Sequence, residues 1–140
     1  MERDLRDVLD TGLHIAPYDF TILASTKRTI DDQVGFIEAG KSFTMNSRHL
    51  HGCAADIAPI IDGRVVWEPW EVYEDMAEAM FQAAHIRGVL IKWGGHFAKL
   101  KSNGSLRVFR DGVHFELPKC THPDKADVLS AIAKYAHLVT

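Results

Sequence analysis

The chain has 140 residues and a mass of 15.7 kDa, which is the size expected of one domain. Its 16 lysines and arginines against 19 aspartates and glutamates leave a net charge of −3, which argues against nucleic-acid binding through bulk positive charge. No apolar run approaches the roughly 18 residues that span a bilayer, so we expect no contact with a membrane. The charged N-terminus is unlike a signal peptide, so we expect the protein to fold in a cytoplasm. We expect residues 1–140 to form a single domain.

The first forty residues predict two helices around a strand. Residues 2–16 carry apolar side chains at helical spacing, and the apolar run at residues 20–26 favours a strand. Thr29 followed by Asp32 predicts a capping box, and the helix that begins there is expected to end near Gly40.

The middle of the chain predicts a loop, a strand pair and a long helix. Residues 41–52 are expected to form the loop, and residues 55–67 predict a strand, a turn at Asp62-Gly63 and a short returning strand. Residues 70–87 predict a helix that ends at Gly88. Its buried stripe is expected to consist of Val72, Met76, Met80 and Ala84.

The last third predicts two more strands and a final helix. Residues 89–93 favour a strand that Gly94-Gly95 breaks, residues 101–105 a turn or loop, and residues 113–117 a second strand. A helix is expected to start at Pro123 and run to the C-terminus. Short strands mixed irregularly with helices predict an α+β fold whose small sheet is mainly antiparallel.

A first polar cluster lies between Ser47 and Asp56, where the predicted loop meets the predicted strand. It contains His49, His51 and Asp56, and the spacing alone does not choose between the two histidines. If a strand begins here, Ala54 and Asp56 share one face, and the small alanine leaves room for an ion beside the carboxylate.

A second cluster lies in the strand predicted at residues 113–117. Alternation sends His114 and Glu116 to its polar face, opposite the apolar side chains of Val113, Phe115 and Leu117. Asp111 stands three residues before His114, across Gly112, where the chain can turn. The residues therefore suggest a second group of possible ligands.

Two histidines and one carboxylate form a common catalytic zinc set that leaves a fourth position for water. Such a site needs a nearby base that is not a ligand, and Asp111 is the candidate. Charge that develops on a substrate carbonyl needs a cation, which Arg28 could supply from the end of the first predicted strand.

Other interpretations of these residues are less specific. A histidine on a strand can be a hydrogen-bonded structural residue, and a site of His49, Cys53, Cys120 and His122 fits no familiar zinc-finger spacing. Two cysteines cannot form a disulfide framework, and a chain of this length can form its core without one. The remaining histidines are expected to be surface or structural residues: His14, His85, His96, His122 and His137.

Residues 35–42 formally match the phosphate-binding loop pattern GxxxxGK[ST]. Such a loop follows a buried strand and opens a helix, whereas this match begins inside a predicted helix and contains Glu38, which would repel phosphate. Nucleotide binding is therefore a minor alternative.

The first cluster matches the pattern SxHxxGxAxD at every fixed position, through Ser47, His49, Gly52, Ala54 and Asp56. With the later acid-x-x-His element at residues 111–114, it resembles the LAS group of zinc peptidases. That group includes D-Ala-D-Ala carboxypeptidases and dipeptidases, phage L-alanyl-D-glutamate endopeptidases and the hedgehog signalling domain. The Asp-Gly-Val-His-Phe-Glu-Leu segment resembles the phage endopeptidase branch most closely. The resemblance spans residues 17–118.

This resemblance implies a hedgehog-like and DD-peptidase-like fold and a role for several residues. His49, Asp56 and His114 would bind Zn²⁺, Asp111 would be the general base, and Arg28 would stabilise the tetrahedral intermediate. It further implies that Ser47 contacts substrate and that His51 is not a ligand. Glu116 would either support a ligand from behind or face the substrate, and the resemblance does not choose between the two. His96 and Phe97 depart from an acidic residue and a tryptophan found in many phage relatives, so substrate contacts and an accessory ion in that loop are not implied here.

The implied function is zinc-dependent cleavage of the L-alanyl–D-glutamate bond of the peptidoglycan stem peptide, as a monomeric phage endolysin. Such a protein would reach the cell wall after another protein permeabilises the membrane. The alternatives are a D,D-carboxypeptidase or dipeptidase on the same scaffold, and a non-catalytic zinc-stabilised binding domain. The presence of Asp111 and Arg28 argues against the binding domain.

Overall fold

The structure is a computed structural model that describes residues 1–42, 44–45, 47–108, 110–120 and 126–138. Within these ranges no helix is both long and apolar enough to cross a membrane. The α-helices are α1 (Arg3–Ile15), α2 (Ile30–Glu38), α3 (Trp70–Arg87) and α4 (Ala126–Lys134). Short 3₁₀ turns are η1 (Ala24–Thr26), η2 (Arg48–His51), η3 (Gly94–His96) and η4 (Ala136–Leu138).

The main sheet has five strands in the order β1-β2-β7-β4, with β3 paired to β2 at one end. These strands are β1 (Asp19–Ile22), β2 (Ala54–Ile61), β3 (Arg64–Val65), β4 (Lys92–Trp93) and β7 (His114–Glu116). A separate hairpin consists of β5 (Ala98–Leu100) and β6 (Leu106–Val108). Every pairing is antiparallel, which confirms the expected α+β fold with a small antiparallel sheet.

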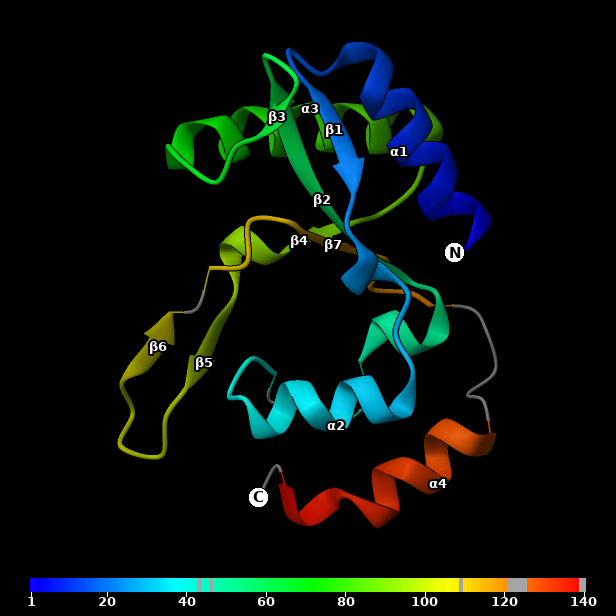
Figure 1. Ribbon diagram of the computed structural model, residues 1–140, viewed down its shortest axis with the longest axis vertical. Coiled ribbons are helices and arrows are strands. Elements are labelled where there is room, and N and C mark those ends of the chain that lie inside the picture. The colour runs from blue at the N-terminus through cyan, green and yellow to red at the C-terminus, as the bar shows by residue number, and fades with distance from the viewer. Residues whose placement is uncertain (43, 46, 109, 121–125, 139–140) are drawn as a thin grey trace.

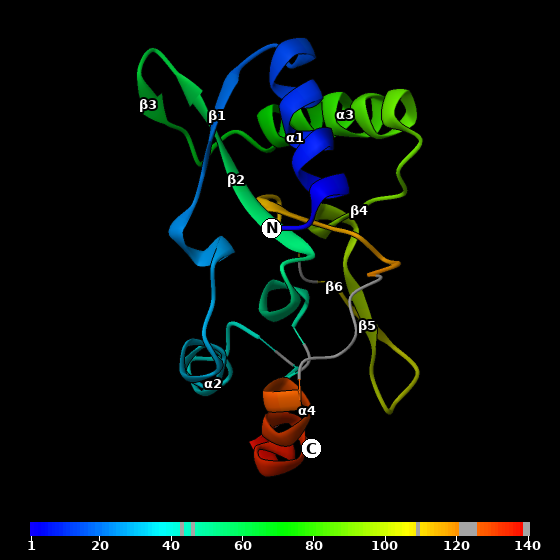
Figure 2. The same ribbon diagram turned by 90° about the vertical axis from the view of Figure 1, so that its right-hand side faces the viewer.

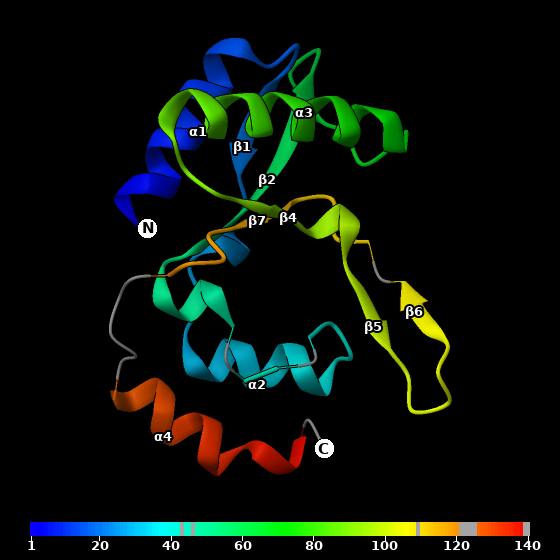
Figure 3. The ribbon, with the colours of Figure 1, turned by 180° about the vertical axis from the view of Figure 1, so that it is seen from behind.

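The elements gather at two ends of the molecule, with the short strands β4 and β7 between them (Figure 1). Helices α1 and α3 pack on each other and cover the sheet at one end, as the view from behind also shows (Figure 3). Helices α2 and α4 and the β5–β6 hairpin lie at the other end (Figures 1 and 2). The core lies between the sheet and the first pair of helices and includes Leu5, Ile57, Met76, Met80 and Phe115.

The register between β2 and β7 positions the polar residues of both clusters. Asp56 lies directly opposite His114, and Ala54 lies opposite Glu116. Strand alternation sends Phe115, which is 1% exposed, into the core, while His114 and Glu116 leave from the other face. One short strand therefore supplies both a core residue and a site residue.

Most predicted elements are present, with shorter strands than expected. The strand predicted over residues 20–26 ends at Ile22, because the chain turns into η1, and the one predicted over 89–93 is reduced to β4. Thr29 and Asp32 form the expected capping box at the start of α2. The β5–β6 hairpin was not predicted. The expected start of the last helix at Pro123 lies outside the described residues.

The two cysteines form a disulfide, which corrects the expectation of a core without one. Cys53 precedes β2 and Cys120 follows β7, and their Cα atoms lie 5.9 Å apart. The antiparallel sheet brings the two cysteines together. Leu117 N donates a hydrogen bond to Cys53 O at 2.8 Å, so the chain that leaves β7 runs beside Cys53. Since each sulfur is bonded to the other, the structure also excludes a metal site that uses both thiolates.

Candidate metal centre

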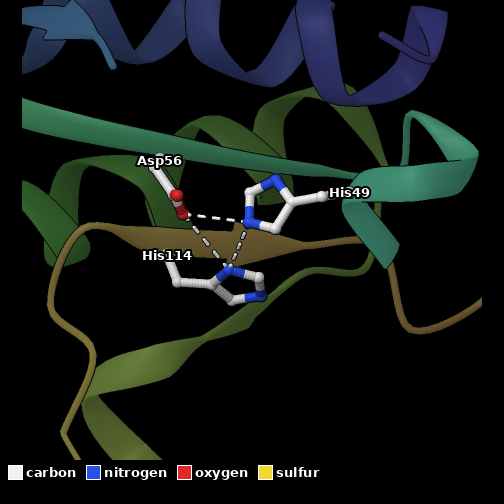
Figure 4. Close-up of side chains that lie close together, drawn as sticks. All are labelled: His49, Asp56 and His114. Atoms are coloured by element: carbon white, nitrogen blue, oxygen red, sulfur yellow. Dashed lines mark hydrogen bonds and ion pairs between the residues drawn. The ribbon is translucent and has the colours of Figure 1, made fainter. Parts of the chain in front are cut away.

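Three buried side chains from distant segments point at one another. Figure 4 shows His49 from η2, Asp56 from β2 and His114 from β7 converging. His49 Nε2 lies 3.1 Å from Asp56 Oδ1 and 3.1 Å from His114 Nδ1, and His114 Nδ1 lies 3.3 Å from Asp56 Oδ1. All three predicted ligands are therefore brought together, each through one atom.

The separations of these atoms match three corners of a tetrahedral metal site. Bonds of about 2.0–2.1 Å to a tetrahedral ion place neighbouring ligand atoms about 3.3 Å apart. The three atoms can thus hold a metal ion with no rearrangement of the backbone, and the fourth corner is left for a further ligand.

The other polar atoms of the three ligands are bonded to the surrounding protein. Thr26 O accepts a hydrogen bond from His49 Nδ1 at 3.1 Å, which leaves Nε2 free to bind an ion. Asp56 Oδ2 accepts from Ser25 Oγ at 2.6 Å, which leaves Oδ1 facing the histidines. Such outer contacts orient metal ligands and are typical of protein metal sites.

The charges within the cluster perturb one another. Burial alone would raise the pKa of Asp56, but hydrogen bonds from His114 and His49 hold it well below its ordinary value. Burial alone would lower the pKa of His114, but its hydrogen bonds to Asp56 and Glu116 raise it to about 9. Without an ion, a proton on His114 therefore balances the Asp56 carboxylate.

The ligands line a pocket of about 800 Å³ together with the other predicted site residues, Arg28, Ser47 and Asp111. Asp111 is reached by solvent through this pocket. Partial desolvation by the surrounding protein, followed by the negative charge of Asp56, raises the pKa of Asp111. Ser47 is buried, and its hydroxyl accepts a hydrogen bond from His49 N at 3.3 Å. Ser47 thus caps the turn that carries a ligand, a contact that the sequence did not predict.

Arg28 is held by four residues at the edge of the cluster. Its guanidinium donates to Gln33 Oε1 at 3.0 Å and to Ser25 O at 3.2 Å. It also lies 3.5 Å from Asp56 Oδ2 and stacks over the Phe36 ring at 4.3 Å. Its pKa is lowered by burial, although Asp56 opposes that effect. Its positive charge is therefore placed beside the ligand carboxylate.

Gly94 allows the segment that carries Asp111 and His114 to approach the sheet. Gly94 O accepts a hydrogen bond from Asp111 N at 2.9 Å. A Cβ atom at Gly94 would lie 2.3 Å from Asp111 O and 2.9 Å from the Cβ of His114. The glycine predicted only as a strand break is therefore a point of close packing beneath the site.

Sequence reasoning missed three residues that support the ligands, Ser25, Thr26 and Arg48. Ser25 and Thr26 were assigned to a strand, although their position before the Arg28-Thr29 pair was a usable signal. Arg48 and Glu116 pair with each other across 68 positions, a contact that no local pattern reveals.

The competing interpretations find less support. The match to a phosphate-binding loop falls in the second half of α2 and the turn after it, so it ends a helix instead of opening one. His51 is buried in η2 but is not part of the three-residue cluster found among the described residues. Of the remaining histidines, His122 lies outside the described residues. The other four are exposed as expected: His14, His85, His96 and His137.

Comparisons with known proteins agree on one family. The family model described as phage L-alanyl-D-glutamate peptidase matches residues 1–118. The L-alanyl-D-glutamate peptidase of Escherichia phage T5 is 32% identical over 122 aligned residues, with coverage of 81% of this chain and 86% of the relative. The solved L-Ala D-Glu endopeptidase ChiX of Serratia marcescens is similar with a TM-score of 0.72 and 32% identity, over 84% of this chain and 80% of that one.

Proposed function

This chain belongs to the phage L-alanyl-D-glutamate peptidase family and is a peptidase, and from that premise we propose that it uses Zn²⁺ to cleave the L-alanyl–D-glutamate bond of peptidoglycan stem peptides. The observation that carries the proposal is the convergence of His49 Nε2, Asp56 Oδ1 and His114 Nδ1 within 3.1–3.3 Å of one another. Two histidines and a carboxylate with an open fourth position form a donor set that suits catalytic zinc.

Zinc in this position would supply a Lewis acid that makes water nucleophilic near neutral pH and polarises a carbonyl. In this proposal Asp111 accepts the proton of the attacking water and passes it to the leaving amine of the D-glutamate residue. The raised pKa of Asp111 favours that second transfer, because a weaker acid holds the proton until the amine leaves.

Two further residues have proposed roles in the pocket. Arg28 would offset the negative charge that develops on the scissile carbonyl, since its guanidinium lines the same pocket as Asp111. Ser47 would contact substrate in addition to capping the turn of His49. We further propose that residues 1–140 form one catalytic domain, acting as a monomer on the cell wall during phage lysis, once the membrane has been permeabilised.

The test is digestion of purified sacculi, with and without a metal chelator, followed by mass spectrometry of the fragments. A new D-glutamate amino terminus that depends on zinc supports the proposal, whereas free D-alanine would identify a carboxypeptidase instead. Asp111→Asn is expected to retain zinc while hydrolysis falls at least about 100-fold, the scale of general-base catalysis. Full activity of that variant would remove Asp111 from the mechanism.

A further inference from the structure

Glu116 lies beside the metal centre but has no part in the proposed chemistry. It follows His114 by two positions on β7, so both side chains leave the same face of the strand. Glu116 Oε1 lies 3.0 Å from His114 Nε2. The side chain of Glu116 is 14% exposed, so it is largely shielded although it lines the pocket.

The carboxylate of Glu116 determines which nitrogen of His114 can hold an ion. A carboxylate only accepts hydrogen bonds, so Nε2 carries a proton, and Nδ1, which faces His49 and Asp56, is the nitrogen whose lone pair is available to an ion. The same contact fixes the orientation of the ring. A carboxylate partner of this kind also raises the basicity of a ligand histidine.

The other oxygen of Glu116 is held by Arg48. Arg48 Nε donates to Glu116 Oε2, across 68 positions of the chain. Arg48 precedes His49 in η2, whereas Glu116 follows His114 in β7. The pair therefore joins the two segments that carry the histidine ligands, through a contact that uses none of the ligand atoms.

We propose that Glu116 is a positioning residue that holds His114 in its ion-binding orientation, and that Arg48 holds Glu116 in place. The inference rests on the metal centre of the proposed function. A direct role in binding substrate is less consistent with the geometry, because both oxygens of Glu116 already have partners within the protein.

The test measures zinc affinity, which a substrate contact would not change. Dissociation constants for Zn²⁺ are determined by competition with a colorimetric chelator for the wild type, Glu116→Ala, Glu116→Gln and Arg48→Ala. Circular dichroism checks that each variant is folded. Glu74→Ala, at an exposed position on α3, is the matched control and should bind zinc like the wild type.

Glu116→Ala is expected to weaken zinc binding about 10–100-fold, the usual effect of removing such a partner. Glu116→Gln keeps an oxygen acceptor of the same reach, so it should bind zinc at least about fivefold more tightly than Glu116→Ala. Arg48→Ala should weaken binding by a smaller factor than Glu116→Ala, because the bond between Glu116 and His114 remains. If Glu116→Ala does not fold, the other two variants still decide the matter.

Three results would overturn the inference. Wild-type zinc affinity in Glu116→Ala or in both other variants, with a raised KM, would make Glu116 a substrate contact and leave the metal centre intact. Equal losses in Glu116→Gln and Glu116→Ala would show that the hydrogen-bond acceptor is not what matters. Failure of the wild type to bind zinc would refute the proposed function itself, and this inference with it.

Discussion

The disulfide between Cys53 and Cys120 makes a prediction about stability that can be worked out from its place in the chain. It closes a loop of 67 residues. By the chain-entropy relation, a cross-link across a loop of that length destabilises the unfolded state by about 4 kcal/mol at 25 °C, and measured values are typically 2–4 kcal/mol. For a chain of 140 residues this amounts to roughly 7–14 °C in the midpoint of thermal unfolding.

The assay is thermal or urea denaturation of the oxidised wild type with and without a phosphine reductant, with chelator present in both arms so that bound metal does not differ. We expect the reductant to lower the wild-type midpoint and to have no effect on Cys120→Ala. The ligand set should survive reduction, because the pairing of β2 with β7 and the bond from Leu117 N to Cys53 O remain. Equal wild-type midpoints in both arms, or two titratable thiols in the oxidised unfolded chain, would refute the reasoning.

Three further predictions concern packing and the metal centre. Gly94→Ala should displace Asp111, because the added Cβ would collide with its carbonyl oxygen, and should weaken both zinc binding and hydrolysis. The control Gly35→Ala, at an open position in α2, should leave both unchanged. Zinc titration and sacculus digestion measure the two effects. Phe115→Ala should lower the free energy of unfolding by about 3–5 kcal/mol, as measured by urea denaturation, because it empties a buried core position. In the folded, chelated protein the pKa of His114 is about 9, above its ordinary value of 6.5. Protonated His114 therefore stabilises the fold fully below about pH 6.5, and that contribution is lost as pH rises through about 9. Urea denaturation over a series of pH values measures it.

The ligands could be identified from the sequence only in part. The period of two in residues 113–117 correctly separated His114 and Glu116 from Phe115, because alternation is a local property of a strand. The local sequence did not distinguish His49 from His51 as the ligand. The choice depends on how η2 turns, since Ser47 caps that turn and Thr26 O orients only the ring of His49.

The fold was predictable where burial leaves a periodic pattern and unpredictable where it does not. Helix α3 was identified from a stripe that is indeed buried, including Met76 and Met80. The β5–β6 hairpin was missed because its strands are three residues long, and Leu106 and Val108, which are 64% and 60% exposed, face no core. The disulfide was missed because its formation depends on the pairing of β2 with β7, which residue spacing does not reveal.

The supporting contacts of the three ligands come from the protein itself, two from η1 and one from β7, so the site can form without a bound ion. Thr26 of η1 holds His49, Ser25 holds Asp56, and Glu116 of β7 holds His114. The core that fixes these segments lies on the opposite face of the sheet and does not include the ligands. Removal of the ion should therefore cost the fold less than it costs a small zinc-dependent domain, in which the ligands themselves replace the core. Metal binding then requires little ordering of the chain, and the protein sets the geometry of the open fourth position.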